Sequence, residues 1–156
     1  MLVYMKTNFN IVCNSTIVSS FIGNIYDAQY YVNLGVLLDN VNDYKKKFKV
    51  SLRFKCPQDA DILLSQTYIC SLIINSRVNT QENLQTSYTL GILDKIADDI
   101  VDGFLSLNCS PDDNPSIIIN GIDRVDKIGL KFNILETAEL FTAMPPYIAI
   151  LNFQEV

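Results

Sequence analysis

Apolar residues between positions 84 and 105 recur with the period of an α-helix, and this is the strongest pattern in the chain. Asn79 and Glu82 precede them at the spacing of a helix cap, and a turn-forming cluster from Asn108 to Pro115 follows. The pattern predicts an amphipathic helix of about six turns over residues 82–107. The residues that carry the repeat are Leu84, Tyr88, Ile92, Leu93, Ile96, Ile100, Val101, Phe104 and Leu105.

Residues 48–55 alternate strictly between apolar and polar side chains, which predicts a strand with one buried side and one basic side. The buried set is Phe48, Val50, Leu52 and Phe54, and the polar set is Lys49, Ser51, Arg53 and Lys55. Other runs rich in Ile, Val, Tyr and Phe predict further strands. These lie within residues 8–22 and 29–38, around 69–74, and at 117–119, 129–135 and 147–153.

Together these elements predict a single α+β domain over residues 1–156. A mostly antiparallel sheet carries the long helix of about 82–107 on one face. The N-terminal strands, about 8–55, either complete this sheet or form an assembly extension that reaches into another subunit. A chain of 156 residues of which 49% are hydrophobic is long and apolar enough to bury one such core.

The chain contains no histidine, which excludes Ser-His-Asp triads, Cys-His pairs and histidine-ligated zinc. Gly-rich phosphate-binding motifs are absent from the sequence, and its four cysteines lack metal-binding or redox spacing. Asp94, Asp98 and Asp102 fit the solvated face of a helix better than a cation site, because one stripe supplies ligands from one side only. We therefore expect a protein that is not an enzyme and uses no cofactor and no metal.

Positive charge is concentrated in residues 45–55 of a chain whose net charge is -5. Two interpretations stay open. Lysines on a strand can protect an exposed sheet edge, or the stretch is an electrostatic interface. The partner of such an interface is either the acidic helix face of a neighbouring copy or the phosphates of a nucleic acid, although Phe48 and Phe54 fall on the core side and form no stacking platform for bases. The candidate interface residues are Lys45, Lys46, Lys47, Lys49, Arg53 and Lys55 on the basic side, and Asp94, Asp98 and Asp102 on the acidic side.

The first residues do not have the pattern of a signal peptide. Residues 7–26 carry no charge, but their many Asn and Ser side chains do not suit lipid. We expect a soluble protein made in the cytoplasm, with no membrane partner. As a whole, the acidic chain should repel nucleic acid, and we expect no sequence-specific nucleic-acid partner.

The order strand, long helix, strand and final strand in residues 68–156 resembles small phage tail-completion proteins, which include tail terminators and neck proteins that join head to tail. The resemblance lies in "TYICSLIINSRV", the turn "NTQEN", the helix "TSYTLGILDKIADDIVDGFLSLN", the strand "SIIINGIDRVDKIG" and the closing "YIAILNFQEV". It implies a helix packed on one face of a sheet and copies that assemble into a ring. It implies no catalytic residues.

The resemblance predicts a non-enzymatic virion protein of a tailed phage, a ring-forming tail terminator or neck subunit. Its partners would be copies of itself and other virion proteins. One alternative is a chaperone-like or adaptor module that presents a sheet edge to peptides. Another is an enzyme that works without histidine through carboxylates, with or without a metal ion.

Overall fold

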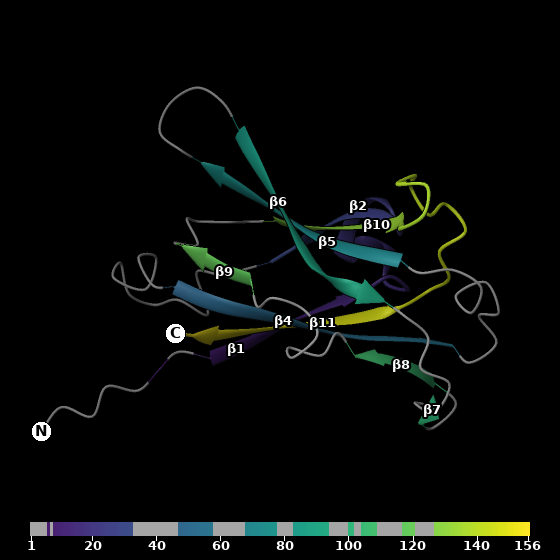
Figure 1. Ribbon diagram of the computed structural model, residues 1–156, viewed down its shortest axis with the longest axis horizontal. Helices are drawn as coiled ribbons and strands as arrows, with labels where there is room; N and C mark the ends of the chain where they lie inside the picture. Colours follow the sequence, from purple (N-terminus) through teal and green to yellow (C-terminus); the bar gives the residue numbers. More distant parts are fainter. Residues whose placement is uncertain are drawn as a thin grey trace, which may run out of the picture.

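The computed structural model describes residue 6 and residues 8–32, 47–57, 68–77, 83–93, 100–101, 104–108, 117–120 and 127–156. These residues form strands joined by turns (Figure 1). The strands are β1 (Asn8–Asn14), β2 (Phe21–Asn24), β3 (Asp27–Tyr31), β4 (Lys47–Pro57), β5 (Tyr68–Arg77), β6 (Asn83–Leu93), β7 (Ile100–Val101), β8 (Phe104–Asn108), β9 (Ile117–Asn120), β10 (Lys127–Ile134) and β11 (Ile148–Glu155), with one short 3-10 turn, η1 (Val18–Ser20).

The strands form two antiparallel sheets that pack face to face. Sheet A has the order β1-β11-β4-β8-β7, and β9 also pairs with β4, beyond the part of β4 that β8 covers. Sheet B has the order β2-β3-β10-β5-β6. Figure 1 shows sheet B as the upper layer and sheet A as the lower one.

The pairing is nested along the chain, with early strands joined to late ones. β1 pairs with β11, β3 with β10, β4 with β8 and β9, and β5 with β6. The chain moves back and forth between the two sheets as it goes. This is the strand order of a jelly roll, a double sheet built from two Greek keys.

Side-chain alternation explains which strand faces form the core. In β4, Phe48, Val50, Leu52 and Phe54 are all buried, as the sequence predicted for this strand. β11 alternates in the same way and buries Ala149, Leu151 and Phe153. Since the side-chain period of a strand is two, each of these strands buries one side and turns the other outward.

Aromatic rings tie the two sheets together. The Phe54 ring of sheet A lies 5.7 Å from the Phe132 ring of sheet B and 5.3 Å from the Tyr147 ring, centroid to centroid. Phe132 and Tyr147 also meet edge to face at 4.9 Å. Aromatic pairs in such geometries stabilise a core beyond the area that they bury.

Tyr147 carries the main polar contacts of this core. Its hydroxyl donates to the carbonyl oxygen of Ile25 at 2.8 Å and lies 2.9 Å from the hydroxyl of Tyr30. Its backbone N–H donates to the Ser15 hydroxyl, and its carbonyl accepts from the Ser15 N–H. These bonds fasten the end of β1, the β2–β3 turn and the start of β11 to one another.

The predicted helix over about 82–107 is wrong, and with it the α+β class. The described residues of this segment form β6, β7 and β8, and the chain that the structure describes contains no α-helix. Leu84 and Tyr88 misled the prediction because a spacing of four is an even number, so it fits one side of a strand as well as one face of a helix. An irregularity in the pairing of β6 with β5 interrupts this repeat before Ile92.

Long-range pairing decides the structure of this segment. β6 pairs with all of β5, from Asn83 opposite Arg77 to Leu93 opposite Tyr68. Within β6, residues 86–89 are Thr, Ser, Tyr and Thr, a composition that favours strands over helices. The helical segment that the described chain does contain, η1, is far too short to cross a lipid bilayer.

Candidate functional site

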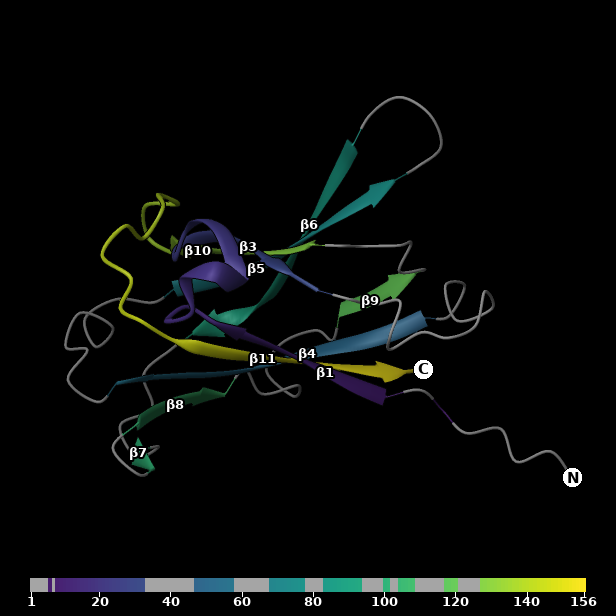
Figure 2. The same cartoon turned by 180° about the vertical axis from the view of Figure 1, so that it is seen from behind.

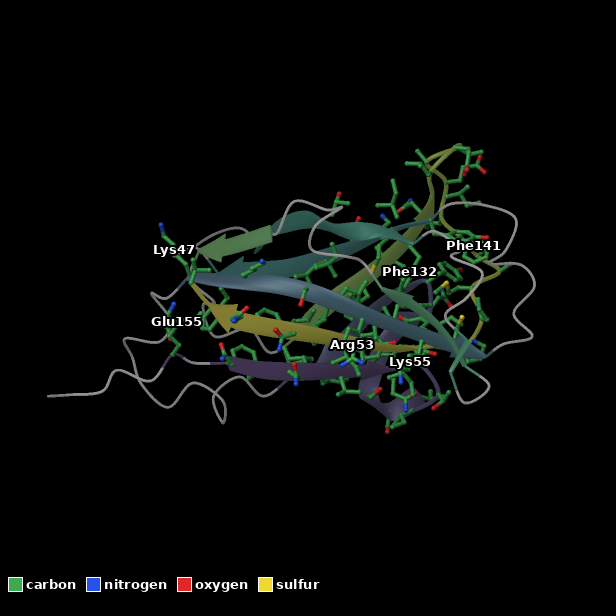
Figure 3. The ribbon with its side chains drawn as sticks, turned by 60° about the horizontal axis from the view of Figure 1, so that its bottom comes forward. Lys47, Arg53, Lys55, Phe132, Phe141 and Glu155 are labelled. Carbon is green, nitrogen blue, oxygen red and sulfur yellow. The ribbon has the colours of Figure 1, made fainter. Side chains whose placement is uncertain are left out.

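The basic residues of β4 form a row on the outer face of sheet A. Lys47 and Arg53 are exposed, and Lys49 and Lys55 are half-buried at outward positions of the same strand. Figure 3 shows Lys47 at one end of the strand and Arg53 and Lys55 toward the other. Ser51 occupies the outward position between the two halves of the row. The alternation of the sequence predicted this arrangement.

Amide side chains accompany the row on the neighbouring strands. Gln154 and Asn152 of β11 stand opposite Lys49 and Ser51. The Asn152 side-chain Nδ2 donates to Oδ1 of Asn10 on β1 at 2.7 Å. The outer face of sheet A is therefore a surface of cations and neutral hydrogen-bonding groups, to which Val12, Ile148 and Ile150 add apolar area.

Among the residues that the structure describes, no carboxylate lies on this outer face. The residues of β8 and β9 that pair with the row are Ser106, Asn108, Ile118 and Asn120, none of them acidic. Glu155, on the adjacent strand, stands opposite Phe48 and is only 8% exposed, on the inner side of the sheet. The positive charges of the row are thus not balanced by the described part of their own face.

β4 lies inside sheet A, which removes one interpretation of its lysines. It pairs with β11 on one side and with β8 and β9 on the other, so Lys49, Arg53 and Lys55 have a strand on both flanks. Lysines that protect a sheet from unwanted pairing belong on edge strands. Edge protection therefore does not explain this row.

The other predicted interface residues are not placed by the structure. Lys45, Lys46, Asp94, Asp98 and Asp102 lie outside the described residues. Because the described parts of 82–107 are strands, the acidic helix face that was to contact the basic strand is not formed as predicted.

The sequence analysis missed a second surface, which we call the β1–β2 edge and define by Val12, Ile17, Val18 and Ile22. Val18 is 78% exposed, Val12 61%, Ile17 50% and Ile22 48%. The pattern assigned these Ile and Val residues to core strands. A signal was present in the 20 uncharged residues from Thr7 to Tyr26, which place apolar side chains between Asn and Ser.

The two strands of this edge lie on the same side of the sandwich. β1 ends sheet A and β2 ends sheet B, and only η1 and its flanking turns separate them. Tyr147 contacts both the end of β1 and the β2–β3 turn. In Figure 2 the segment that follows β1 lies beside β3 and β10. Both sheets therefore end in the segment that holds these residues, with Val12 on the outer face of sheet A and Ile22 on the outer face of sheet B.

The described cysteines do not have the environment of reactive thiols. Cys13, Cys56 and Cys70 are thiols buried in the core. Burial raises the pKa of the Cys13 thiol to about 12 and that of Cys56 to about 11, so both stay protonated at neutral pH. Within the described ranges, no three His, Cys, Asp or Glu side chains are grouped closely enough to hold a metal ion.

Comparison with known proteins finds no matching family model, no similar curated protein and no similar solved structure.

Proposed function

We propose that this protein is a structural, non-enzymatic subunit of a virion that assembles with copies of itself through the β1–β2 edge. A ring in the tail or neck of a phage is the form of assembly that the sequence resemblance predicts. That resemblance included a helix that the described residues do not form, so the proposal rests on the edge. The single observation that carries it is the exposure of Val12, Ile17, Val18 and Ile22, which lie in or between the two strands that end the sheets.

Exposed apolar side chains become favourable contacts when a second chain covers them. Burying a Val or Ile side chain contributes roughly 1.5–3 kcal/mol relative to leaving it in water. Single exposed apolar residues are ordinary on a protein surface, but contiguous groups mark interaction sites. Here four of them fall within the 11 residues from Val12 to Ile22.

The edge also lacks the usual protection against pairing with another chain. Natural edge strands often carry lysine or another charged residue, or a proline, and these residues prevent pairing with a further strand. β1 reads NFNIVCN and β2 reads FIGN, without a charge or a proline in either. Among the described strands, β1 pairs only with β11 and β2 only with β3, so each offers a second side to a partner.

The fold supports the same class of function more weakly. Jelly rolls form viral capsid domains, but they also form lectins and cupins, so this support is by analogy only. The high pKa values of Cys13 and Cys56 argue against thiol catalysis at these two positions.

The test measures native mass by light scattering on a size-exclusion column, with negative-stain imaging of the same fractions. The expected result is a closed oligomer for the wild type and a smaller species for the Val18→Asp, Ile22→Lys double variant. Leu135→Asp is the matched control, because Leu135 is 44% exposed in the turn after β10, outside the edge. Retained mass in the double variant would refute assembly through this edge.

A monomeric wild type would favour the alternative, an adaptor that adds a peptide strand to the same edge. In that case β1 or β2 should take up an extended peptide, and the double variant should lose it.

A further inference from the structure

We infer that the outer face of sheet A binds the phosphodiester backbone of a nucleic acid without reading its sequence. The binding residues are Lys47, Lys49, Arg53 and Lys55 of the interior strand β4; of the residues that define the β1–β2 edge, Val12 lies on the same outer face. It does not depend on assembly of the chain.

The geometry of β4 arranges these cations as a row of two pairs, Lys47 with Lys49 and Arg53 with Lys55, on either side of Ser51. Alternate residues of a strand lie about 6.6–6.8 Å apart, and the row from Lys47 to Lys55 is about 27 Å long. A polyanion with regularly repeated charges matches such a row better than a compact ligand with one charge. Figure 3 shows β4 running the length of the sheet, so the row is not interrupted by a change of direction.

The charges on this face are arranged to attract an external anion. The described strands of this face carry no acidic side chain. Neighbouring like charges at this spacing repel by roughly 0.6 kcal/mol in water. A polyanion laid along the row removes that repulsion and releases its own condensed counterions.

The neutral residues of the face favour backbone contacts over base recognition. Asn10, Ser51, Asn152 and Gln154 provide donors and acceptors beside the cations. Arg53 supplies a fork of donors suited to phosphate oxygens. The phenylalanines of β4 point into the core, so they cannot stack on bases. Binding should therefore tolerate any sequence.

The experiment measures fluorescence anisotropy of labelled 20-nucleotide single-stranded DNA, the same sequence as RNA, and the DNA duplex, each over a range of salt concentrations. With four phosphates contacted, the slope of log K against log salt for the single strand should be about -2.8. The double variant Arg53→Gln, Lys55→Gln should halve this slope and weaken binding by about tenfold or more at low salt. Preference among the three probes identifies the backbone that fits.

The matched control is Lys127→Gln, Lys131→Gln, which removes the same charge from the outer face of sheet B. It should leave binding within about twofold of the wild type, since these positions lie on the opposite side of the molecule. Equal weakening by both double variants, or no binding by the wild type at low salt, would overturn the inference. Competition by polyglutamate as strong as that by DNA would overturn it too, in favour of an acidic protein partner.

Discussion

The cations on the two outer faces of the sandwich have different neighbours. On sheet B, Lys131 stands opposite Asp27 in the pairing of β10 with β3. The Lys127 Nζ lies 5.7 Å from the centre of the Tyr31 ring. On sheet A, the described residues that stand directly opposite the four cations of β4 are neither acidic nor aromatic.

This difference separates charges that the fold accommodates from charges that it leaves available. A cation beside a carboxylate or over a ring already has a favourable neighbour in its own chain. The described strands of sheet A give their cations no acidic neighbour on the same face. The two faces therefore differ in function more than in structure, because both are built on the same alternation of inward and outward residues.

Strand β4 tests this distinction most strongly, since it carries the core on one side and the cations on the other. Phe54→Ala should destabilise the protein by about 3–5 kcal/mol, because it leaves a cavity between Phe132 and Tyr147. Arg53→Ala, one residue away, should change stability by no more than about 0.5 kcal/mol. Urea unfolding measures both. Similar losses would contradict the division of β4 into a structural side and a free side.

Gly129, on the outer face of sheet B, gives the next largest effect. A Cβ added there would lie 2.9 Å from the Cβ of Ile73. Replacing a strand glycine with alanine usually stabilises a protein by about 0.5–1 kcal/mol, but Gly129→Ala should instead cost about 1–3 kcal/mol. Ser51→Ala, at an outward position of sheet A, is the control and should be nearly neutral. A stabilised Gly129→Ala variant would show that the two faces are equally open.

The stability of the protein at alkaline pH tests the core between the two sheets. Burial raises the pKa of Tyr30 to about 12, so the folded state favours the protonated phenol. Its contribution to stability is complete below about pH 10, its ordinary value, and is lost as the pH rises through 12. Cys13 acts in the same direction from about pH 9.

The variant for this test is Tyr30→Phe, with melting temperatures measured from pH 8 to 12. It should cost about 1 kcal/mol at pH 8, through loss of the hydrogen bond to Tyr147, and the difference should shrink toward pH 12. Tyr31→Phe, at an exposed position, is the control. Parallel curves for wild type and Tyr30→Phe would contradict the role of burial.

Strand positions could be predicted from the sequence where alternation was complete. The burial of Phe48, Val50, Leu52 and Phe54 and the outward row of cations both follow from a period of two. β11 was predicted for the same reason, with Tyr147, Ala149, Leu151 and Phe153 on one side, and all four are buried.

The rest depended on contacts between distant residues. β6 is a strand because it pairs with β5, and no local spacing revealed that partner. The exposure of Val12 and Ile22 could not be predicted either, because these residues resemble core residues until the strand order places β1 and β2 at the edges. The sequence also did not reveal that β4 is an interior strand, which excludes edge protection as the role of its lysines.

The position of β11 determines when sheet A can form during synthesis of the chain. This last strand lies between β1 and β4, and its register brings Asn8 opposite Gln154, nearly the whole chain away. During synthesis, β1 and β4 are made before β11, the strand that lies between them in the sheet. Sheet A can close only when Glu155 has left the ribosome, and such distant pairing folds slowly. A premature stop before Ile148 would remove the middle of sheet A, whereas a loss of similar length from an outer strand would shorten only an edge.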